Sequence, residues 1–364
     1  MTESTSKIRV LVVDDSDVDI MRLVNLFNSD ARFQIVGTAS SGAEAISFNK
    51  QLAPSIIVMS VTIGGRSSVE TTERIMHTRP VPIVLCAGLS TSDADLSFRA
   101  MAAGGLAVVG KLSAPLHPDH SAQARKIKDT VVNMAEVKLV RRWHRAKTHT
   151  PSVDRNAAPA PRAANRLNLV VIGASTGGPP ALTKILSLLH PDFPLPILVV
   201  QHIAPGFLAG MAHWLQQTSR RKVHIAGEKE RPLPGEVYLA PDDCHMEVDA
   251  DGMIVRQSRT KTNIYCPAVA RLFQSVAKSR LADRTIAMLL TGMGADGAKE
   301  LLLLRQHGAI TIAQDAKSSV VHGMPGEAIR LGAALHVLPP EGIAELLTEL
   351  VRTQTPAAVK PECR

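Results

Sequence analysis

Short, continuously apolar runs alternate with amphipathic stretches in two parts of this 364-residue chain, and a polar segment separates the two parts. A continuous apolar run is typical of a parallel strand that is buried on both faces, with helices between successive strands. The first part contains five such runs, at 8–13, 33–37, 55–59, 82–86 and 106–109. This pattern predicts a doubly wound α/β domain, which we place at 7–125.

The second part repeats the alternation from residue 167 onward. Its apolar runs lie at 169–172, 196–201, 285–290, 310–313 and 336–338. Residues 236–256 look different, because the turn Asp249–Gly252 lies between two strand-like runs, as in an antiparallel hairpin. We therefore expect a second, mostly parallel α/β domain with one hairpin at 167–355, closed by an amphipathic helix at 340–352.

The net charge of the chain is concentrated between these two domains. The chain carries 41 Lys and Arg against 33 Asp and Glu, a net charge of +8. Residues 125–166 hold eleven of the basic and three of the acidic residues, which accounts for the whole excess. Residues 147–166 are also rich in Ala and Pro and lack an apolar period, as in an exposed linker. We interpret 126–166 as a basic helix and linker, either a solvated hinge or a surface for an acidic partner.

Composition excludes several classes of protein. Aromatic residues make up only 3% of the chain, which leaves few rings for stacking on bases, so nucleic-acid binding is not expected. No apolar run approaches the roughly 20 residues that span a bilayer, and residues 1–10 lack the pattern of a signal peptide. Cys86, Cys244, Cys266 and Cys363 have no CxxC spacing, which indicates neither a disulfide framework nor a zinc site. These features predict a cytoplasmic protein that does not span a membrane.

Charged residues follow two of the predicted strands of the first domain. Asp14 and Asp15 come directly after the first strand, and Lys111 follows the fifth. The carboxyl edge of a doubly wound sheet is where this fold binds its ligands, and two carboxylates there suit Mg²⁺. The alternative is a solvated loop with three ordinary charges.

Residues 10–16 and 53–60, together with Lys111, resemble the receiver domain of two-component response regulators. The resemblance implies an acid pair that holds Mg²⁺ and an aspartate, at the end of the third strand, that accepts a phosphoryl group. Ser60 occupies that position here, and it can neither form an acyl phosphate nor supply a carboxylate to the metal. Cys86-Ala87 also departs from the pattern, because the family usually carries Ser or Thr at this position after the fourth strand. We expect a degenerate receiver that is not phosphorylated on aspartate, and Mg²⁺ binding is in doubt for the same reason.

A serine lies on a glycine-rich turn after the first strand of the second domain. Residues 173–177 read Gly-Ala-Ser-Thr-Gly and match the G-x-S-x-G pattern, whose glycines let a serine hydroxyl project from a sharp strand-to-helix turn. The alternative is a dinucleotide loop. That loop would place glycine at Ser175 and an acidic residue after the next strand, which instead ends in Gln201-His202. Ser175 is therefore the candidate nucleophile.

A nucleophilic serine needs a base, and the base needs an orienting carboxylate. His202 immediately follows the second strand of this domain, and Asp296 lies on a glycine-rich turn after the strand at 285–290. Taken singly, a histidine is more often structural, and Asp296 would suit the N-cap of a helix at 297–307. Their coincidence with Ser175 at one sheet edge favours a Ser-His-Asp site. The chain order Ser…His…Asp differs from that of α/β-hydrolases.

Further motifs of the second domain resemble the catalytic domain of chemotaxis protein-glutamate methylesterases. They lie at 172–178, 201–207, 237–241 with His245, 290–298, 311–315 and 323–328. A receiver, a linker and this domain, in that order, is also the architecture of the family. The resemblance implies that Ser175 is the nucleophile, His202 the base, Asp296 its orienting acid and the Met293 amide an oxyanion donor. We add the amide of Thr176 as a second donor.

The resemblance implies a serine hydrolase, without a cofactor, that removes γ-methyl esters from glutamates on methyl-accepting chemoreceptors and releases methanol. Deamidation of receptor glutamines is the implied second activity, and the histidine kinase of the chemosensory array is a further implied partner. Three alternatives are an esterase of a chemosensory-like pathway outside chemotaxis, a DNA-binding response regulator and a scaffold without catalysis. The α/β pattern of 167–364 argues against the second alternative, and the intact triad argues against the third.

Overall fold

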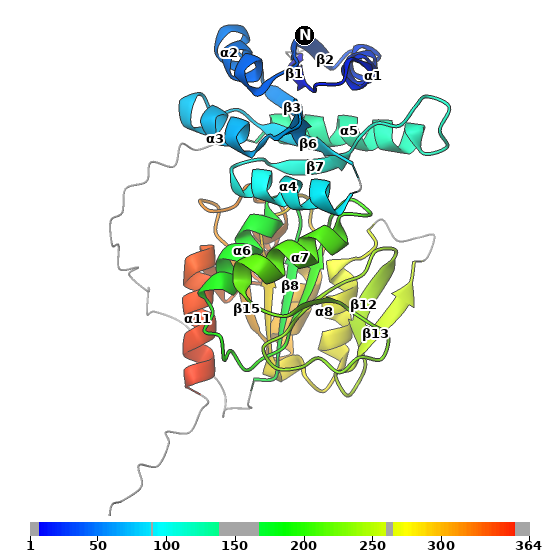
Figure 1. The fold of residues 1–364 in the computed structure, drawn as a ribbon. Helices are drawn as coiled ribbons and strands as arrows, with labels where there is room; N and C mark the ends of the chain where they lie inside the picture. The colour runs from blue at the N-terminus through cyan, green and yellow to red at the C-terminus, as the bar shows by residue number, and fades with distance from the viewer. Residues whose placement is uncertain (1–6, 89, 138–166, 260–264, 354–364) are drawn as a thin grey trace, which may run out of the picture. The chain divides into compact units, whose positions relative to one another are not determined.

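The computed structural model describes residues 7–88, 90–137, 167–259 and 265–353. The chain divides into two compact units, each built on its own parallel sheet with helices between the strands (Figure 1). The two α/β domains expected from the apolar runs are therefore confirmed as a fold class. No helix in these ranges is long and apolar enough to cross a bilayer.

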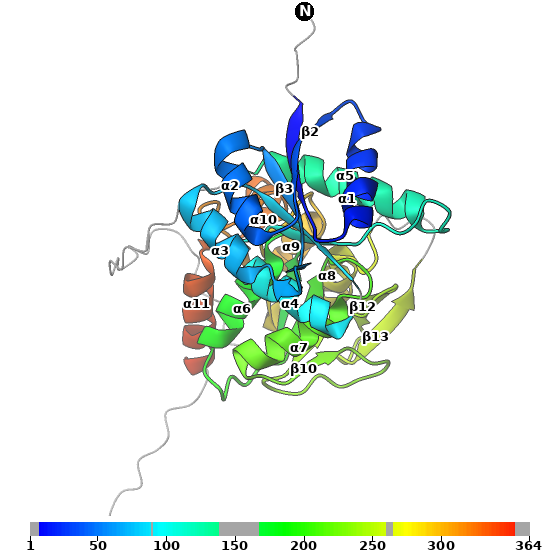
Figure 2. The same cartoon turned by 45° about the horizontal axis from the view of Figure 1, so that its top comes forward.

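The first unit contains a five-stranded parallel sheet in the order β2-β1-β3-β6-β7. The strands are β1 (Ile8–Val13), β2 (Phe33–Ala39), β3 (Ile56–Ser60), β6 (Ile83–Ala87) and β7 (Ala107–Gly110), and a short antiparallel pair, β4 (Thr62–Ile63) and β5 (Arg66–Ser67), follows β3. The helices are α1 (Asp17–Asn28), α2 (Gly42–Leu52), α3 (Val69–Thr78), α4 (Thr91–Ala102) and α5 (His120–Ala135). Helices α2, α3 and α4 follow one another along one side of this sheet (Figure 2).

Local sequence explains where these helices begin. Helices α1, α2 and α4 start after Ser16, Ser41 and Ser90, and each serine side chain accepts the amide hydrogen bond of the residue three positions later. Such a side chain satisfies a helix amide that has no partner within the helix. Helix α5 packs against β3, β6 and β7, so the predicted boundary at residue 125 falls inside a helix of this unit. From residue 138, the predicted extension of this helix and the linker at 147–166 lie outside the described residues.

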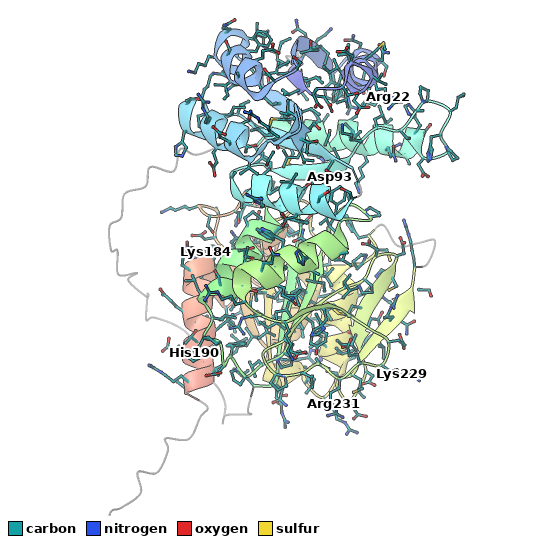
Figure 3. The ribbon with its side chains drawn as sticks, in the orientation of Figure 1. Arg22, Asp93, Lys184, His190, Lys229 and Arg231 are labelled. Carbon is teal, nitrogen blue, oxygen red and sulfur yellow. The ribbon has the colours of Figure 1, made fainter. Side chains whose placement is uncertain are left out.

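The second unit contains a seven-stranded parallel sheet in the order β10-β11-β9-β8-β14-β15-β16. The strands are β8 (Leu169–Ala174), β9 (Ile197–Gln201), β10 (Val223–Ile225), β11 (Val237–Leu239), β14 (Thr285–Leu289), β15 (Ile310–Gln314) and β16 (His336–Leu338). The connections between strands contain α6 (Gly178–Leu188), α7 (Leu208–Ser219), α8 (Val269–Lys278), α9 (Ala298–Gln306) and α10 (Met324–Arg330), and α11 (Pro340–Arg352) follows β16. Helices α6 and α11 pack together, and Nζ of Lys184 in α6 lies 3.5 Å from Oε1 of Glu341 in α11. Lys184 is labelled in Figure 3.

The predicted hairpin is present, but it is shorter than 236–256. It consists of β12 (Cys244–Val248) and β13 (Ile254–Ser258), which are antiparallel around the predicted turn. Strand β11 pairs in parallel with β9 and β10 and belongs to the main sheet instead. Strand β10 has only three residues and includes a histidine, which leaves no apolar run in the sequence to indicate it.

One face of the second sheet is covered by the hairpin, α8 and α9. Val171 and Leu198 of the sheet belong to one buried cluster with Met246 of β12, Phe273 of α8 and Leu301 of α9. The chain runs from β8 to β9 on one side and later returns to β14 on the other side of β8. Ligand sites of doubly wound folds lie outside the carboxyl ends of the strands at such a reversal.

Candidate active site

Ser175 lies on the turn that joins β8 to α6, and its side chain is half-buried. Its amide donates a hydrogen bond to the Thr291 carbonyl at 3.0 Å, and its carbonyl accepts one from the Gly178 amide at 2.8 Å. The turn needs glycine at Gly177, whose φ of +77° is in the left-handed region. Both the strand end and the helix start therefore fix the backbone that carries the hydroxyl.

A second glycine lets another loop approach this serine. Gly292 follows β14, and a Cβ built on it would lie 2.7 Å from Ser175 Cβ and 2.5 Å from Met324 Sδ. No side chain larger than hydrogen fits there without displacing one of these neighbours. Gly292 thereby brings the loop that contains Met293 and Asp296 against the turn of Ser175.

His202 lies at the end of β9, next to the end of β8. Its amide donates to the Ala174 carbonyl at 2.9 Å, which joins the two strand ends. Its Nε2 lies 2.9 Å from Oδ2 of Asp296, and both side chains are nearly buried. The structure thus brings together the histidine and the aspartate that the sequence placed at one sheet edge.

Asp296 binds the start of a helix as well as the imidazole. Its Oδ2 accepts the Val269 amide at 2.7 Å and its Oδ1 accepts the Ala270 amide at 3.1 Å, both in the first turn of α8. Burial raises the pKa of Asp296, but the hydrogen bond and charge of His202 and these two amides outweigh it. The pKa of Asp296 therefore lies below its usual range, and the carboxylate is ionised at neutral pH.

The N-cap alternative for Asp296 names the wrong helix. Helix α9 begins after Gly297 and has no side-chain cap. Asp296 instead caps α8, whose own flanking residue, Ala268, has no side chain that could do so. The same carboxylate therefore serves a helix start and a histidine, so the structural and the catalytic interpretations are compatible.

The ionised carboxylate determines which nitrogen of His202 can act as a base. An anion accepts a hydrogen bond, so Nε2 carries the proton, and in the neutral ring Nδ1 then has a free lone pair. Among the residues that the structure describes, no hydrogen bond joins Ser175 Oγ to His202. Proton transfer from the serine therefore has to reach Nδ1.

Three polar side chains that the sequence argument did not assign to the site support it. Gln201 is buried, and its Nε2 donates to the carbonyls of Ser175 at 2.8 Å and of His202 at 2.9 Å. Thr291 is buried, and its Oγ1 donates to the Thr176 carbonyl at 2.9 Å. The Tyr265 ring stacks on the imidazole of His202. A polar residue at the end of a buried strand was the available signal for Gln201 and Thr291, whereas no sequence feature indicated Tyr265.

The two predicted oxyanion donors lie on the two loops that Gly292 brings together. Thr176 follows the candidate nucleophile, and Met293 follows Gly292. Within the described ranges, neither amide donates a hydrogen bond to a protein acceptor. Both are thus available to an oxygen that develops negative charge beside Ser175.

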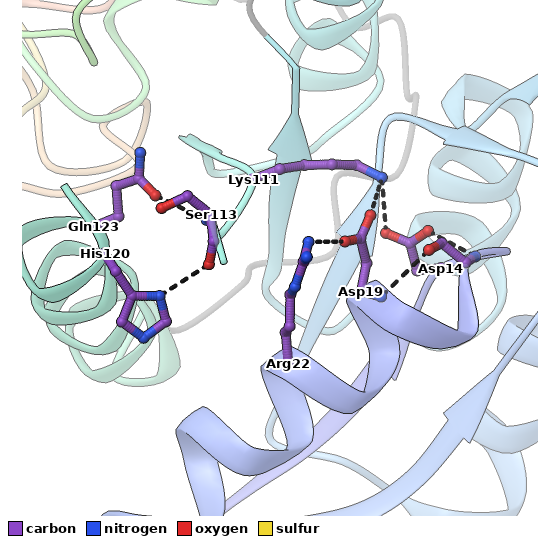
Figure 4. Close-up of polar contacts among 8 residues, drawn as sticks. Asp14, Asp19, Arg22, Lys111, Ser113, His120 and Gln123 are labelled. Atoms are coloured by element: carbon purple, nitrogen blue, oxygen red, sulfur yellow. Dashed lines mark hydrogen bonds and ion pairs between the residues drawn. The ribbon is translucent and has the colours of Figure 1, made fainter. Parts of the chain in front are cut away.

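The structure also brings together part of the predicted receiver site (Figure 4). Asp14 is fully buried, and its Oδ2 lies 3.2 Å from Nζ of Lys111. Lys111 also binds Oδ2 of Asp19 at 2.9 Å, and Asp19 in turn accepts a hydrogen bond from Arg22 at 3.1 Å. Neither Asp19 nor Arg22 was predicted from the sequence. Burial, only partly offset by the Ser16 amide and the Lys111 ammonium, raises the pKa of Asp14 above its usual range.

The other residues beside Asp14 and Lys111 do not fit a divalent cation. Ser60 is buried, and its Oγ has no hydrogen-bond partner among the described residues. Its neighbour across β3 and β6 is Cys86, whose pKa burial raises to about 12, so the thiol is neutral. Asp15 Oδ2 accepts the Gly64 amide at 2.8 Å. Ser60 supplies no third carboxylate to this site, and Lys111 already neutralises the buried carboxylate of Asp14. In the described ranges, no cluster of three acidic, His or Cys side chains could hold a metal.

Comparison with known proteins gives the family of the chain. The CheB methylesterase model matches residues 170–347, and the response regulator receiver domain model matches residues 10–117. A protein-glutamate methylesterase/protein-glutamine glutaminase from Nitrosospira multiformis is 48% identical over 94% of this chain and 97% of its own length. A protein with the same name from Geobacter metallireducens is 44% identical over 94% of this chain and 99% of its own length.

A solved structure resembles the second unit in sequence. The methylesterase catalytic domain of Thermotoga maritima CheB is 41% identical, and the match covers all of that domain and 51% of this chain with a TM-score of 0.49. The two full-length relatives share both parts of the chain in the same order, which a match to one domain alone would not establish. The chain therefore belongs to the CheB methylesterase family, with a response regulator receiver domain before the catalytic domain.

Proposed function

We propose that this chain is a protein-glutamate methylesterase that hydrolyses glutamyl γ-methyl esters on the cytoplasmic helices of methyl-accepting chemoreceptors. The same site would deamidate receptor glutamines, since the relatives are named for both activities. The observation that carries the proposal is the hydrogen bond from His202 to the ionised Asp296, beside Ser175, in a chain of this family. A cytoplasmic location and a histidine kinase as a further partner belong to the same proposal.

The reaction starts with proton transfer from the serine. Nδ1 of His202 takes the proton of Ser175 Oγ while this oxygen attacks the ester carbonyl. The imidazolium that forms is stabilised by Asp296 through Nε2. The oxygen of the tetrahedral intermediate becomes negative and accepts hydrogen bonds from the amides of Met293 and Thr176.

The intermediate then collapses in two steps. His202 returns the proton to the methoxy oxygen as the bond between this oxygen and the acyl carbon breaks. Methanol departs, and the acyl group stays bound to Ser175 as an acyl-enzyme. His202 next takes a proton from water while the hydroxide attacks the acyl carbon. It then gives this proton to Ser175 Oγ as the acyl C–O bond breaks, which releases the glutamate and restores the serine. For a glutamine substrate, the same protonation releases ammonia. No step needs a cofactor, because every proton passes through one imidazole.

The direct test is methanol release from methylated receptor membranes by the Ser175→Ala variant. Removing a triad nucleophile or base costs about 10⁴- to 10⁶-fold in rate, so Ser175→Ala and His202→Ala should lose nearly all methanol release. A matched control is Ser187→Ala, since Ser187 is an exposed serine on α6. If Ser175→Ala kept most of the activity, the assignment of the site would be wrong.

We further propose that the first unit is not phosphorylated on aspartate and that the esterase does not respond to a phosphodonor. Ser60 lies where the acceptor aspartate would be, and it cannot form an acyl phosphate. The Lys111 ammonium is paired with the carboxylates of Asp14 and Asp19, so it already neutralises part of the negative charge that a divalent cation would need. Regulation of the esterase through this unit would then need a signal other than phosphorylation on aspartate.

A further inference from the structure

Tyr265 lies flat against the imidazole of His202. The two ring centroids are 4.8 Å apart and the ring planes differ by 6°, so the stack is parallel. The Tyr265 side chain is 41% exposed, whereas that of His202 is only 14% exposed. An aromatic residue that is open to solvent on one side and covers a candidate base on the other is not accounted for by core packing.

We infer that Tyr265 is a positioning residue that stabilises His202 while that ring carries the proton of Ser175. The inference rests on the proposed function, because it concerns the charge that His202 gains during the reaction. The face of a phenol ring is electron-rich and attracts a cation above it. It attracts the neutral imidazole much less, so the interaction is stronger in the transition state than before the reaction.

Asp296 and Tyr265 hold the imidazole in complementary directions. Asp296 binds Nε2 at the ring edge, at 2.9 Å, and Tyr265 covers one face. The carboxylate alone would leave the ring free to swing about the Nε2 hydrogen bond. The stacked ring opposes this motion, and Nδ1 is thereby kept in the direction from which a serine proton can arrive.

The exposure of Tyr265 adds a role for bound substrate. A protein segment that places a glutamyl ester at Ser175 would displace water from this exposed ring. Electrostatic attraction strengthens when water is excluded. The stack should therefore contribute most in the enzyme–substrate complex, so its effect should appear in kcat rather than in KM.

The test compares Tyr265→Phe with Tyr265→Leu in the full-length chain, with kcat and KM measured as methanol release from methylated receptor membranes. Phe keeps the ring face, so its kcat should stay within twofold of the wild type. Leu keeps an apolar side chain but not the face, and its kcat should fall by about 3- to 30-fold, equivalent to about 0.6–2 kcal/mol, with KM within twofold.

Each other outcome would overturn the inference. A raised KM with unchanged kcat for Tyr265→Leu would make Tyr265 a substrate contact. An equal loss of kcat in Tyr265→Phe and Tyr265→Leu would assign the effect to the hydroxyl, and an unchanged kcat in both would leave the ring without a role. If Tyr265→Leu does not fold, Tyr265→Met replaces it under the same criteria. Ser175→Ala, assayed in parallel, shows separately whether the proposed function holds.

Discussion

Each unit places a carboxylate at the carboxyl edge of its parallel sheet, but the two carboxylates have different surroundings. Asp296 in the second unit accepts hydrogen bonds from an imidazole and from two amides at the start of α8. Its pKa is lowered although it is buried. Asp14 in the first unit accepts one amide, from Ser16, and faces the shared ammonium of Lys111. Its pKa is raised, because burial outweighs these partners.

The two sites also differ in the chemistry that each carboxylate could support. In the second unit, every group needed to hold a negative charge beside a histidine is present, and the histidine lies next to a candidate nucleophile. In the first unit, the acid pair and the lysine are present, but Ser60 lies at the position that we propose for the acceptor aspartate. Under this proposal, the first unit has the charged residues of a receiver site without the group that would be phosphorylated.

The contrast between the two carboxylates would fail most clearly if the esterase did not need Asp296 for its activity. Asp296→Asn removes the charge that stabilises the imidazolium and offers a second donor to Nε2, so the wrong tautomer of His202 is favoured. We expect kcat for methanol release to fall by about 10⁴-fold. Asp192→Asn is the matched control, since Asp192 is an exposed aspartate. A loss of less than tenfold in Asp296→Asn would exclude the role assigned to this carboxylate.

The next effect concerns the close approach of two loops in the second unit. In Gly292→Ala, the new methyl group would lie 2.7 Å from Ser175 Cβ and would have to displace it. A displacement of about 1 Å at a catalytic group typically costs about 10²-fold, so we expect a 10- to 100-fold loss of kcat. In Gly342→Ala, the Cβ would meet its neighbours at ordinary distances of 3.4 Å or more. That variant should keep full activity, and equal behaviour of the two variants would contradict the argument.

The third effect is on stability, and its sign is opposite in the two units. Because the pKa of Asp14 is raised, the folded first unit holds this proton more tightly than the unfolded chain does. The free energy of unfolding therefore falls as the pH rises from the ordinary carboxyl pKa through the raised pKa of Asp14. Asp14→Asn should therefore increase the free energy of unfolding of the first unit at neutral pH, because the amide that replaces the carboxylate carries no charge. Calorimetry of the full chain measures this change.

The same calorimetric comparison distinguishes the two carboxylates. The gain from Asp14→Asn should vanish in acid below the ordinary carboxyl pKa, where Asp14 is protonated in both states. Asp296 has a lowered pKa, so its ionised form stabilises the second unit above the ordinary pKa, and this contribution is lost as the pH falls through the lowered one. Asp296→Asn should thus destabilise the second unit at neutral pH. The same sign for both variants would refute the contrast.

The fold, and the position of Ser175, His202 and Asp296 after strands of one parallel sheet, could be predicted because they depend on local patterns. Continuous apolar runs gave the strands, and parallel strands put the residues after them at one edge. The predicted start of the hairpin, at residue 236, was wrong. Val237–Leu239 is an apolar run that would suit either the hairpin or the main sheet, and only its long-range pairing with β9 places it in the main sheet.

The supporting contacts of the site could not be predicted, because they join residues that are distant in sequence. The choice of α8 over α9 as the helix that Asp296 caps depends on how two loops meet. Gln201 and Thr291 appear in the sequence only as polar residues beside apolar runs. The link from Lys111 to Asp19 spans 92 residues and crosses from β7 to α1.

The most direct measurement is methanol release by the full chain from methylated receptor membranes, with and without acetyl phosphate. We predict methanol release by the wild type, none above background by Ser175→Ala, and the same wild-type rate with and without the phosphodonor. A rate that rises with acetyl phosphate would show that the first unit still accepts a phosphoryl signal despite Ser60. Release that persists in Ser175→Ala would contradict the account of the second unit.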